Sequence, residues 1–190
     1  MKRALIIVDV QNDFLPGGSL AVPHGNNVIP VINQILKDKK FDVIIVSRDW
    51  HPIDHTAFKD TWPIHCVQNT KGAELSEELN IWDYKFIEVL KGEDKEKHPY
   101  SAFALEYNED SKLVAFNDLD KTLFKEGIKE VYVCGLAAEY CVLDTARDAA
   151  KLGFKSFMVM DATKSIHIPL VDILEQIKLA DIKPIYSNEI

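Results

Sequence analysis

Short apolar, β-branched runs alternate with segments of helical periodicity along most of the chain. This alternation is typical of an α/β fold with a mainly parallel sheet. The runs are nearly continuous in hydrophobic residues, as in strands that are covered on both faces. They predict six strands, at Arg3–Asp9, Asp42–Ser47, Lys85–Leu90, Glu130–Gly135, Lys155–Met160 and Lys183–Ser187.

Helical spacing of apolar residues fills the intervals between these strands. The chain contains no internal repeat or low-complexity tract, and its 190 residues suit one domain spanning residues 1–190. The charged segment 92–99 is expected to be an exposed, solvated loop. The predicted helices lie at Gly25–Lys39, Asp118–Glu126, Glu139–Leu152 and Leu170–Leu179.

Reactive side chains fall at the ends of four predicted strands. Asp9 ends the first strand, and Asp49 follows the second. Lys91 follows the third strand, and Cys141 lies just beyond the fourth, at the start of a helix. Ligands of an open parallel sheet bind outside the carboxyl ends of its strands. We therefore expect these four residues to meet at one edge of the sheet.

Histidines and carboxylates are concentrated just after the second predicted strand. Three of the chain's six histidines, His51, His55 and His65, lie within the 18 residues that begin at Arg48. In extended backbone Asp49 and His51 project to the same side, and His65 can return as a third ligand. Imidazoles with a carboxylate suit a Lewis-acidic divalent ion. The same pattern also suits a polar surface loop, so the residues alone leave both interpretations open.

Cys141 is a candidate nucleophile that follows the small-residue run Gly135-Leu136-Ala137-Ala138. The positive end of a helix favours a thiolate, and its free backbone N–H groups offer an oxyanion hole. Asp9 is the acid–base candidate, and Lys91 would hold the carboxylate–thiolate pair electrostatically. A lone cysteine is also often a small buried core residue, which is our interpretation of Cys134.

Composition narrows the classes of partner. The net charge of −8 argues against nucleic acid or an anionic membrane surface as the main partner. Three cysteines form an odd and sparse set, which fits a reducing compartment. The apolar run that begins at Ala4 ends at Asp9, so no secretory leader or membrane span is indicated. We expect a cytoplasmic protein, and a homo-oligomer stays open.

Several motifs match one known family in a single order along the chain, within residues 8–149. With them the chain resembles the nicotinamidase/pyrazinamidase group of the isochorismatase-like cysteine hydrolases. The two histidine-containing motifs select that group. The motifs are Val8-Asp9-Val10-Gln11-Asn12-Asp13-Phe14, Ser47-Arg48-Asp49-Trp50-His51-Pro52, Trp62-Pro63-Ile64-His65-Cys66-Val67, Lys91-Gly92, Tyr100-Ser101-Ala102-Phe103 and Glu139-Tyr140-Cys141-Val142.

The resemblance implies both a fold and an activity. The fold would be a three-layer, Rossmann-like (isochorismatase-like) open, mainly parallel six-stranded sheet with helices on both faces. The activity would be hydrolysis of nicotinamide, with pyrazinamide as a surrogate, to the acid and ammonia through a cysteine thioester, serving NAD salvage. One divalent metal ion, zinc before iron or manganese, would meet the ring nitrogen of the substrate.

The resemblance also assigns catalytic roles. Asp9, Lys91 and Cys141 would form the catalytic triad. The backbone N–H groups of Ala137 and Cys141 would form the oxyanion hole. A cis peptide bond is expected between Leu136 and Ala137.

Metal and substrate contacts follow from the same resemblance. Asp49, His51 and His65 would bind the metal, and His55 and Asp60 compete for a fourth ligand position, which water can also fill. The walls of an aromatic substrate slot would come from Phe14, Trp62 and Tyr100.

Two other functions remain as alternatives. One is another amidase of the superfamily, acting on a carbamoyl or ureido compound, or isochorismatase chemistry; those relatives generally need no metal at Asp49, His51 and His65. The other is a non-catalytic module that binds a small ligand or a protein. A reactive thiol in the set Asp9, Lys91 and Cys141 argues against a module that only binds.

Overall fold

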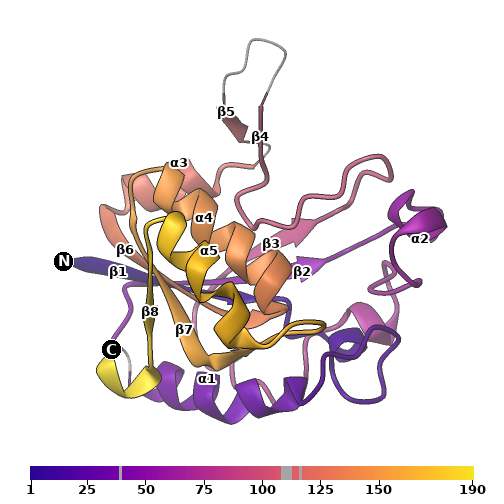
Figure 1. The fold of residues 1–190 in the computed structure, drawn as a ribbon, viewed down its shortest axis with the longest axis horizontal. Helices are drawn as coiled ribbons and strands as arrows, with labels where there is room; N and C mark the ends of the chain where they lie inside the picture. Colours follow the sequence, from indigo (N-terminus) through magenta and orange to yellow (C-terminus); the bar gives the residue numbers. More distant parts are fainter. Residues whose placement is uncertain (39, 108–112, 116) are drawn as a thin grey trace.

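The computed structural model describes residues 1–38, 40–107, 113–115 and 117–190. A six-stranded sheet in the order β3-β2-β1-β6-β7-β8 forms its centre, and all neighbouring strands are parallel (Figure 1). Each of the six predicted strands is confirmed within a few residues. The strands are β1 (Lys2–Val8), β2 (Val43–Asp49), β3 (Ile87–Lys91), β6 (Ile128–Leu136), β7 (Lys155–Lys164) and β8 (Ile182–Ile185).

Helices cover both faces of the sheet (Figure 1), as the resemblance implied. One helix lies on one face, and three lie together on the other. The single helix is α1 (Val28–Lys37), and the three are α3 (Leu119–Lys125), α4 (Leu143–Lys151) and α5 (Leu174–Leu179).

The central strand β1 supplies both hydrophobic cores. Ala4, Ile6 and Val8 pack with α3, α4 and α5, whereas Leu5 and Ile7 pack on the α1 side. All five side chains are fully buried. Successive strand residues point to opposite faces, so a strand between two helical layers needs apolar residues at every position. This requirement explains the continuous apolar runs in the sequence.

The order of strands fixes where a ligand can bind. From β1 the chain builds outward to β2 and β3, and it then returns to β6 on the other side of β1. The direction of winding therefore reverses between β1 and β6. In open parallel sheets a crevice forms at this switch point, outside the carboxyl ends of the two strands. Asp9 follows β1 there, and Cys141 follows β6.

Several local features differ from the predicted elements. The helix predicted from Glu139 begins as a π-helical turn, Ala138–Val142, and continues as α4. Short 3-10 turns likewise precede α1 and α5. The pattern did not reveal three short elements, α2 (Ala57–Asp60), β4 (Leu105–Tyr107) and β5 (Leu113–Ala115).

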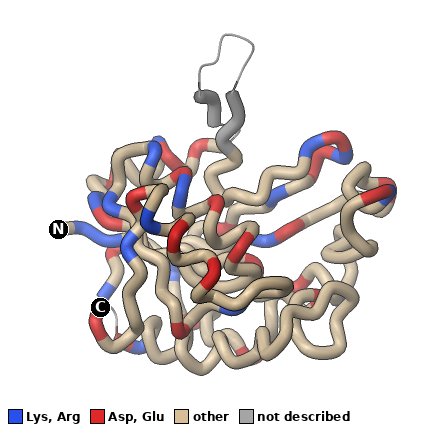
Figure 2. The backbone as a smooth tube through the Cα atoms, viewed as in Figure 1, with Lys and Arg blue, Asp and Glu red and all other residues tan. Residues whose placement is uncertain are grey.

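The charged segment 92–99 is only partly the solvated loop that was expected. The residues at positions 93–97 are exposed, and Figure 2 shows acidic and basic residues along this segment. Its backbone nevertheless docks on the segment after β2. The Lys95 carbonyl accepts hydrogen bonds from the N–H and the hydroxyl of Thr56, at 2.9 and 2.8 Å. Among the described residues, no helix has the length and apolar character needed to cross a membrane.

Candidate active site

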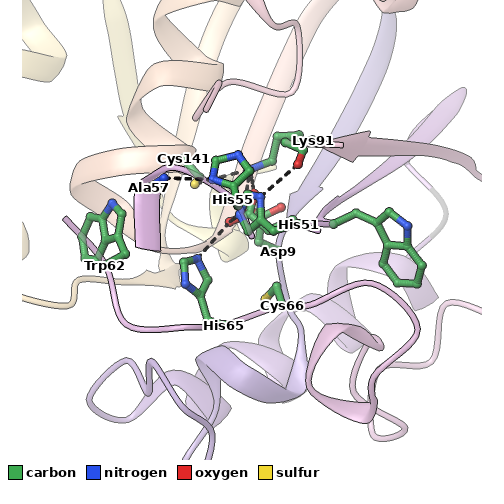
Figure 3. Close-up of polar contacts among 12 residues, drawn as sticks. Asp9, His51, His55, Ala57, Trp62, His65, Cys66, Lys91 and Cys141 are labelled. Atoms are coloured by element: carbon green, nitrogen blue, oxygen red, sulfur yellow. Dashed lines mark hydrogen bonds and ion pairs between the residues drawn. The ribbon is translucent and has the colours of Figure 1, made fainter. Parts of the chain in front are cut away.

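A buried lysine lies among two carboxylates and a thiol at the ends of four strands. Lys91, the last residue of β3, is 2% exposed. Its Nζ lies 2.7 Å from Oδ2 of Asp9 and 2.6 Å from Oδ1 of Asp49. It also contacts Sγ of Cys141 at 3.5 Å. The structure thus brings together the four strand-end residues, and Figure 3 shows three of them, Asp9, Lys91 and Cys141, beside His51.

Close approach of β1 and β6 shapes the floor of this site. Gly135 pairs with Val8 at a φ of +114°, and a Cβ at this position would overlap the Val8 backbone. Glycine is needed here both for the positive φ and for the lack of a side chain. The next residue after Val8, Asp9, has a φ of 50°. It accepts a 2.7 Å hydrogen bond from the Ser47 hydroxyl at Oδ1, which leaves Oδ2 for Lys91.

The Gln11 side chain extends the pairing of β1 with β2 beyond the end of β1. Its Oε1 accepts a 2.8 Å hydrogen bond from the N–H of Asp49, and its Nε2 donates to the Asp49 carbonyl at 2.7 Å. Nε2 also donates to the Ala73 carbonyl at 2.9 Å. Gln11 is fully buried. The amide therefore fixes the backbone of Asp49, a role that no sequence signal other than its place in the first motif suggested.

Asp49, His51 and His65 form a second cluster beside the lysine. Nε2 of His51 lies 3.6 Å from Oδ2 of Asp49, and Nε2 of His65 lies 3.8 Å from the same oxygen. The opposite ring nitrogens face backbone carbonyls, of Gly92 at 3.1 Å and of Pro63 at 2.7 Å. Such second contacts orient the imidazoles, so that each Nε2 faces Asp49.

These donors fit a divalent metal ion. Nε2 of His51 is buried and has no hydrogen-bond partner in the described part of the chain. A buried polar atom without a partner needs an explanation, and an ion supplies one. The three ligand atoms lie within 4.8 Å of one another, as donors around a common centre do. Two imidazoles and one carboxylate match the ligands of open divalent sites.

The fourth-ligand candidates His55 and Asp60 do not join this cluster. Nδ1 of His55 accepts the N–H of Ala57, and Nε2 lies 3.1 Å from the carbonyl of Lys97, so both ring nitrogens are engaged. Asp60 is exposed at the end of α2. Among the described residues this arrangement offers three ligands, which favours the alternative in which water fills the fourth position.

The two carboxylates beside Lys91 have opposite pKa shifts. Burial acts to raise the pKa of Asp49, but Lys91 and the imidazoles of His51 and His65 outweigh it and hold this pKa well below its usual value. Burial also raises the pKa of Asp9, and here Lys91 only partly offsets it. Lys91 itself has a pKa well above its usual value, because the two carboxylates outweigh the effect of burial. Asp49 therefore stays anionic, and Asp9 is the carboxylate that can carry a proton.

Burial also dominates at Cys141. It raises the pKa of the thiol well above its usual value, and the nearby charge of Lys91 only partly opposes this. The prediction that a helix N-terminus favours a thiolate is wrong for the resting site, because Cys141 lies in a buried π-helical turn before α4 begins. The thiol therefore needs a base. The peptide bond between Leu136 and Ala137, just before this turn, is cis, as the resemblance implied.

A cavity of about 340 Å³, part of it open to solvent, lies beside Cys141. Phe14, Trp62 and Tyr100, the aromatic residues expected from the resemblance, all line it. The Trp62 indole N–H donates to the Tyr100 hydroxyl at 3.2 Å. Asp49, His65 and Ala137 line the same cavity, so the thiol and two of the three metal donors face one space.

Sequence reasoning missed four residues of the cavity wall. His98 comes from the charged segment, and its ring centroid lies 5.3 Å from that of His51. Burial lowers the pKa of His98 to about 4, so its ring is neutral at physiological pH. The sequence signal that could have identified His98 was its position two residues before Tyr100, which was predicted to line the slot. The missed residues are Leu20, His98, Tyr140 and Ile166.

Known proteins resemble this chain over most of its length. A family model described as the isochorismatase domain matches residues 3–173. A nicotinamidase of Acinetobacter baylyi is 39% identical over 182 residues, which cover 86% of this chain and 81% of the relative.

Solved structures share the fold. The pyrazinamidase of Pyrococcus horikoshii in complex with zinc has a TM-score of 0.80 at 39% identity, covering 98% of this chain and 99% of the other. The yeast nicotinamidase bound to the inhibitor nicotinaldehyde has a TM-score of 0.85 at 33% identity, covering 97% and 99%. The chain therefore belongs to the isochorismatase family, in which it groups with nicotinamidases and pyrazinamidases.

Proposed function

We propose that this protein hydrolyses nicotinamide to nicotinate and ammonia, and pyrazinamide to its acid, a reaction that would serve NAD salvage. One observation carries the proposal: the Cys141 thiol and the donors of Asp49 and His65 face the same aromatic-walled cavity. A nucleophile can attack a carboxamide while the donor cluster holds the other end of a flat ring. The nicotinamidase and pyrazinamidase relatives support this substrate class.

In the first half-reaction Asp9 takes the proton of the Cys141 thiol, and the thiolate attacks the carboxamide carbon. The C=O electrons move to the oxygen, and the N–H groups of Ala137 and Cys141 stabilise this oxyanion. Asp9 then gives its proton to the amide nitrogen. The C–N bond breaks, ammonia leaves and a thioester remains on Cys141.

Water completes the cycle. Asp9 takes one proton from a water molecule, whose oxygen attacks the thioester carbon. When the tetrahedral intermediate collapses, the C–S bond breaks and the thiolate of Cys141 regains the proton from Asp9. The product leaves as nicotinic acid and loses its remaining proton to solvent to give nicotinate, while Asp9 and Cys141 have returned to their starting states. The raised pKa of Asp9 suits a carboxylate that binds and releases a proton twice in each turnover.

Lys91 supports both steps without exchanging a proton. Its raised pKa keeps the ammonium charged. At 2.7 Å from Asp9 and 3.5 Å from Cys141, this charge holds the carboxylate in place and favours the thiolate as it forms. The low dielectric of the buried site strengthens both effects.

Asp49, His51 and His65 would hold one divalent ion, for which we propose zinc, with iron or manganese as alternatives. When bound, the ion supplies a Lewis acid for the lone pair of the ring nitrogen. Three nitrogen and oxygen ligands with an open position are typical of catalytic zinc sites. The zinc complex of the Pyrococcus horikoshii relative supports this choice. Phe14, Trp62 and Tyr100 would enclose the ring of the substrate.

The test is ammonia release from nicotinamide by the purified protein, before and after chelation and after adding back zinc, iron or manganese. We expect release that falls on chelation and returns with metal. Release that persists after verified metal removal would keep the amidase and discard the ring-orienting ion. No release with any metal would contradict the proposal, and carbamoyl and ureido compounds assayed in parallel would then test the alternative amidase.

A further inference from the structure

One carboxylate joins the turn of the nucleophile to the far wall of the cavity. Glu139 lies in the π-helical turn Ala138–Val142, two residues before Cys141. Both of its carboxylate oxygens lie 3.1 Å from the N–H of Ile166. Oε1 also accepts the N–H of His167 at 2.6 Å and that of Ile168 at 3.4 Å. Three consecutive backbone donors therefore converge on one side chain.

These donors belong to the 165–169 segment, which links β7 to α5 (Figure 1). Ile166 lines the cavity that contains Cys141. The ring of His167 stacks on that of Trp62, with centroids 6.0 Å apart and planes inclined by 9°. Trp62 in turn donates to Tyr100. A shift of this segment would therefore move both the aliphatic wall and the support of an aromatic wall.

The chemistry of the contact requires an anion. Three adjacent N–H groups that point at one place form a concave donor site, which suits a carboxylate better than a neutral acceptor. None of the three residues is in a strand or helix of the described chain, so these amides gain no partner from regular structure. Glutamine would keep the size of the side chain but replace one acceptor oxygen by a donor that faces another donor.

We propose that Glu139 is a positioning residue that sets the width of the substrate slot by tying the 165–169 segment to the turn of Cys141. This inference rests on the proposed function, because width is defined by the aromatic amide that the slot accepts. Glu139 acts through Ile166 and His167 and touches no reacting atom. It thereby determines how strictly the enzyme excludes substituents on the ring.

The test compares Glu139→Gln with Asp144→Asn. Asp144 lies three residues after Cys141 and pairs with Arg147 at 2.9 Å on α4, so its variant also removes a carboxylate near the nucleophile. The kcat and KM of each variant are measured with nicotinamide and with 5-methylnicotinamide. The ratio of the two kcat/KM values does not depend on the fraction of folded enzyme, so a purely structural defect leaves it unchanged.

For Glu139→Gln we expect KM for nicotinamide to rise about tenfold. We also expect kcat/KM for 5-methylnicotinamide to rise about tenfold relative to kcat/KM for nicotinamide, because one methyl group changes kcat/KM by a factor of about 10 or more in a tight pocket. Asp144→Asn should keep the parent ratio. Ile166→Ala should reproduce the gain of the methyl analogue, and adding Glu139→Gln to it should add less than the sum of the two effects. Hydrogen exchange of the amides at 166–168 should also become faster in Glu139→Gln.

A ratio equal to that of the parent in an active Glu139→Gln enzyme would overturn the inference and leave the proposed function intact. Unchanged exchange at 166–168 would overturn it as well. If Glu139→Gln does not fold, Ile166→Ala serves as the test. A kcat/KM ratio equal to that of the parent in Ile166→Ala would show that this wall does not select the substrate, and it would overturn the inference. A parent protein that releases no ammonia from nicotinamide with any metal would overturn the proposed function and the inference together.

Discussion

Asp9 and Asp49 are both buried carboxylates, and both lie within 2.7 Å of the same ammonium of Lys91. Their pKa values nevertheless shift in opposite directions. Asp49 also faces the imidazoles of His51 and His65, whereas the other charge near Asp9 is Asp49 itself. Burial and one shared cation therefore do not decide the protonation state. The protonation state of each carboxylate is decided by the charged or polar groups that it faces in addition to Lys91.

The difference divides the site into two halves with different tasks. Under the proposed function, the Asp49 half holds a metal ion, which needs a ligand that stays ionised. The Asp9 half moves protons, which needs a carboxyl group whose protonated and ionised forms are closer in energy than those of Asp49. Each half can therefore be disabled separately: the Asp49 half should still bind metal, and the Asp9 half should still present a Cys141 thiol that can be alkylated.

The largest effect is expected from Cys141→Ala. Without the nucleophile, kcat should fall by about 10⁴-fold or more, as when other covalent nucleophiles are removed. Zinc content, measured by elemental analysis of the dialysed protein, should match that of the parent, because Cys141 belongs to the other half. The control is Cys134→Ala, since Cys134 is buried in β6 and contacts the Ile6 carbonyl instead of the cavity. Appreciable turnover by Cys141→Ala would rule out the covalent route.

Asp9→Asn should remove the proton carrier and lower kcat/KM by about 10²- to 10⁴-fold, again with metal retained. In the parent, activity should rise with pH as the Asp9–Cys141 pair loses its first proton, because acylation needs one proton on the pair. Burial raises the pKa of Asp9, so this acid limb should lie above the usual value of 3.8. The pH profile of kcat/KM checks both points. A limb at or below 3.8 would contradict this account of Asp9.

His51→Ala disables the other half. Loss of a ligand should weaken zinc binding by about 100-fold or more, measured by competition with a chromophoric chelator. Alkylation of Cys141 by iodoacetamide, followed by mass spectrometry, should proceed as in the metal-free parent. Asp60→Asn is the control, because the structure leaves this exposed carboxylate outside the cluster. A loss of affinity in Asp60→Asn as large as in His51→Ala would place Asp60 among the ligands.

Gln11→Ala should have the smallest effect, on the backbone that connects the two halves. Removing the amide leaves the N–H and carbonyl of Asp49 without partners in a buried position. The free energy of unfolding should fall by about 2 to 3 kcal/mol, measured by urea denaturation. Gln68→Ala, which removes a single hydrogen bond to the Trp50 carbonyl, should cost about 1 kcal/mol. Equal losses in the two variants would show that Gln11 gives the Asp49 backbone no special support.

The pattern of apolar residues was sufficient to predict the layered architecture. Strands buried on both faces must be apolar at every position, so runs such as the one from Ala4 to Val8 reveal themselves without any partner. The meeting of Asp9, Asp49, Lys91 and Cys141 could also be predicted, since the carboxyl ends of parallel strands share one edge. Motif resemblance added the activity and the metal ligands.

How these groups act depends on contacts that form only when the chain is folded. The opposite pKa shifts of Asp9 and Asp49 depend on distances between strands that are remote in sequence. The raised pKa of Cys141 reflects burial, which a local helix argument omits. His55 became unavailable to a metal through hydrogen bonds to its own segment and to the charged loop. The contacts of Glu139 with the 165–169 segment are equally hidden, because hydrogen bonds to backbone amides leave no residue pattern at the donor positions.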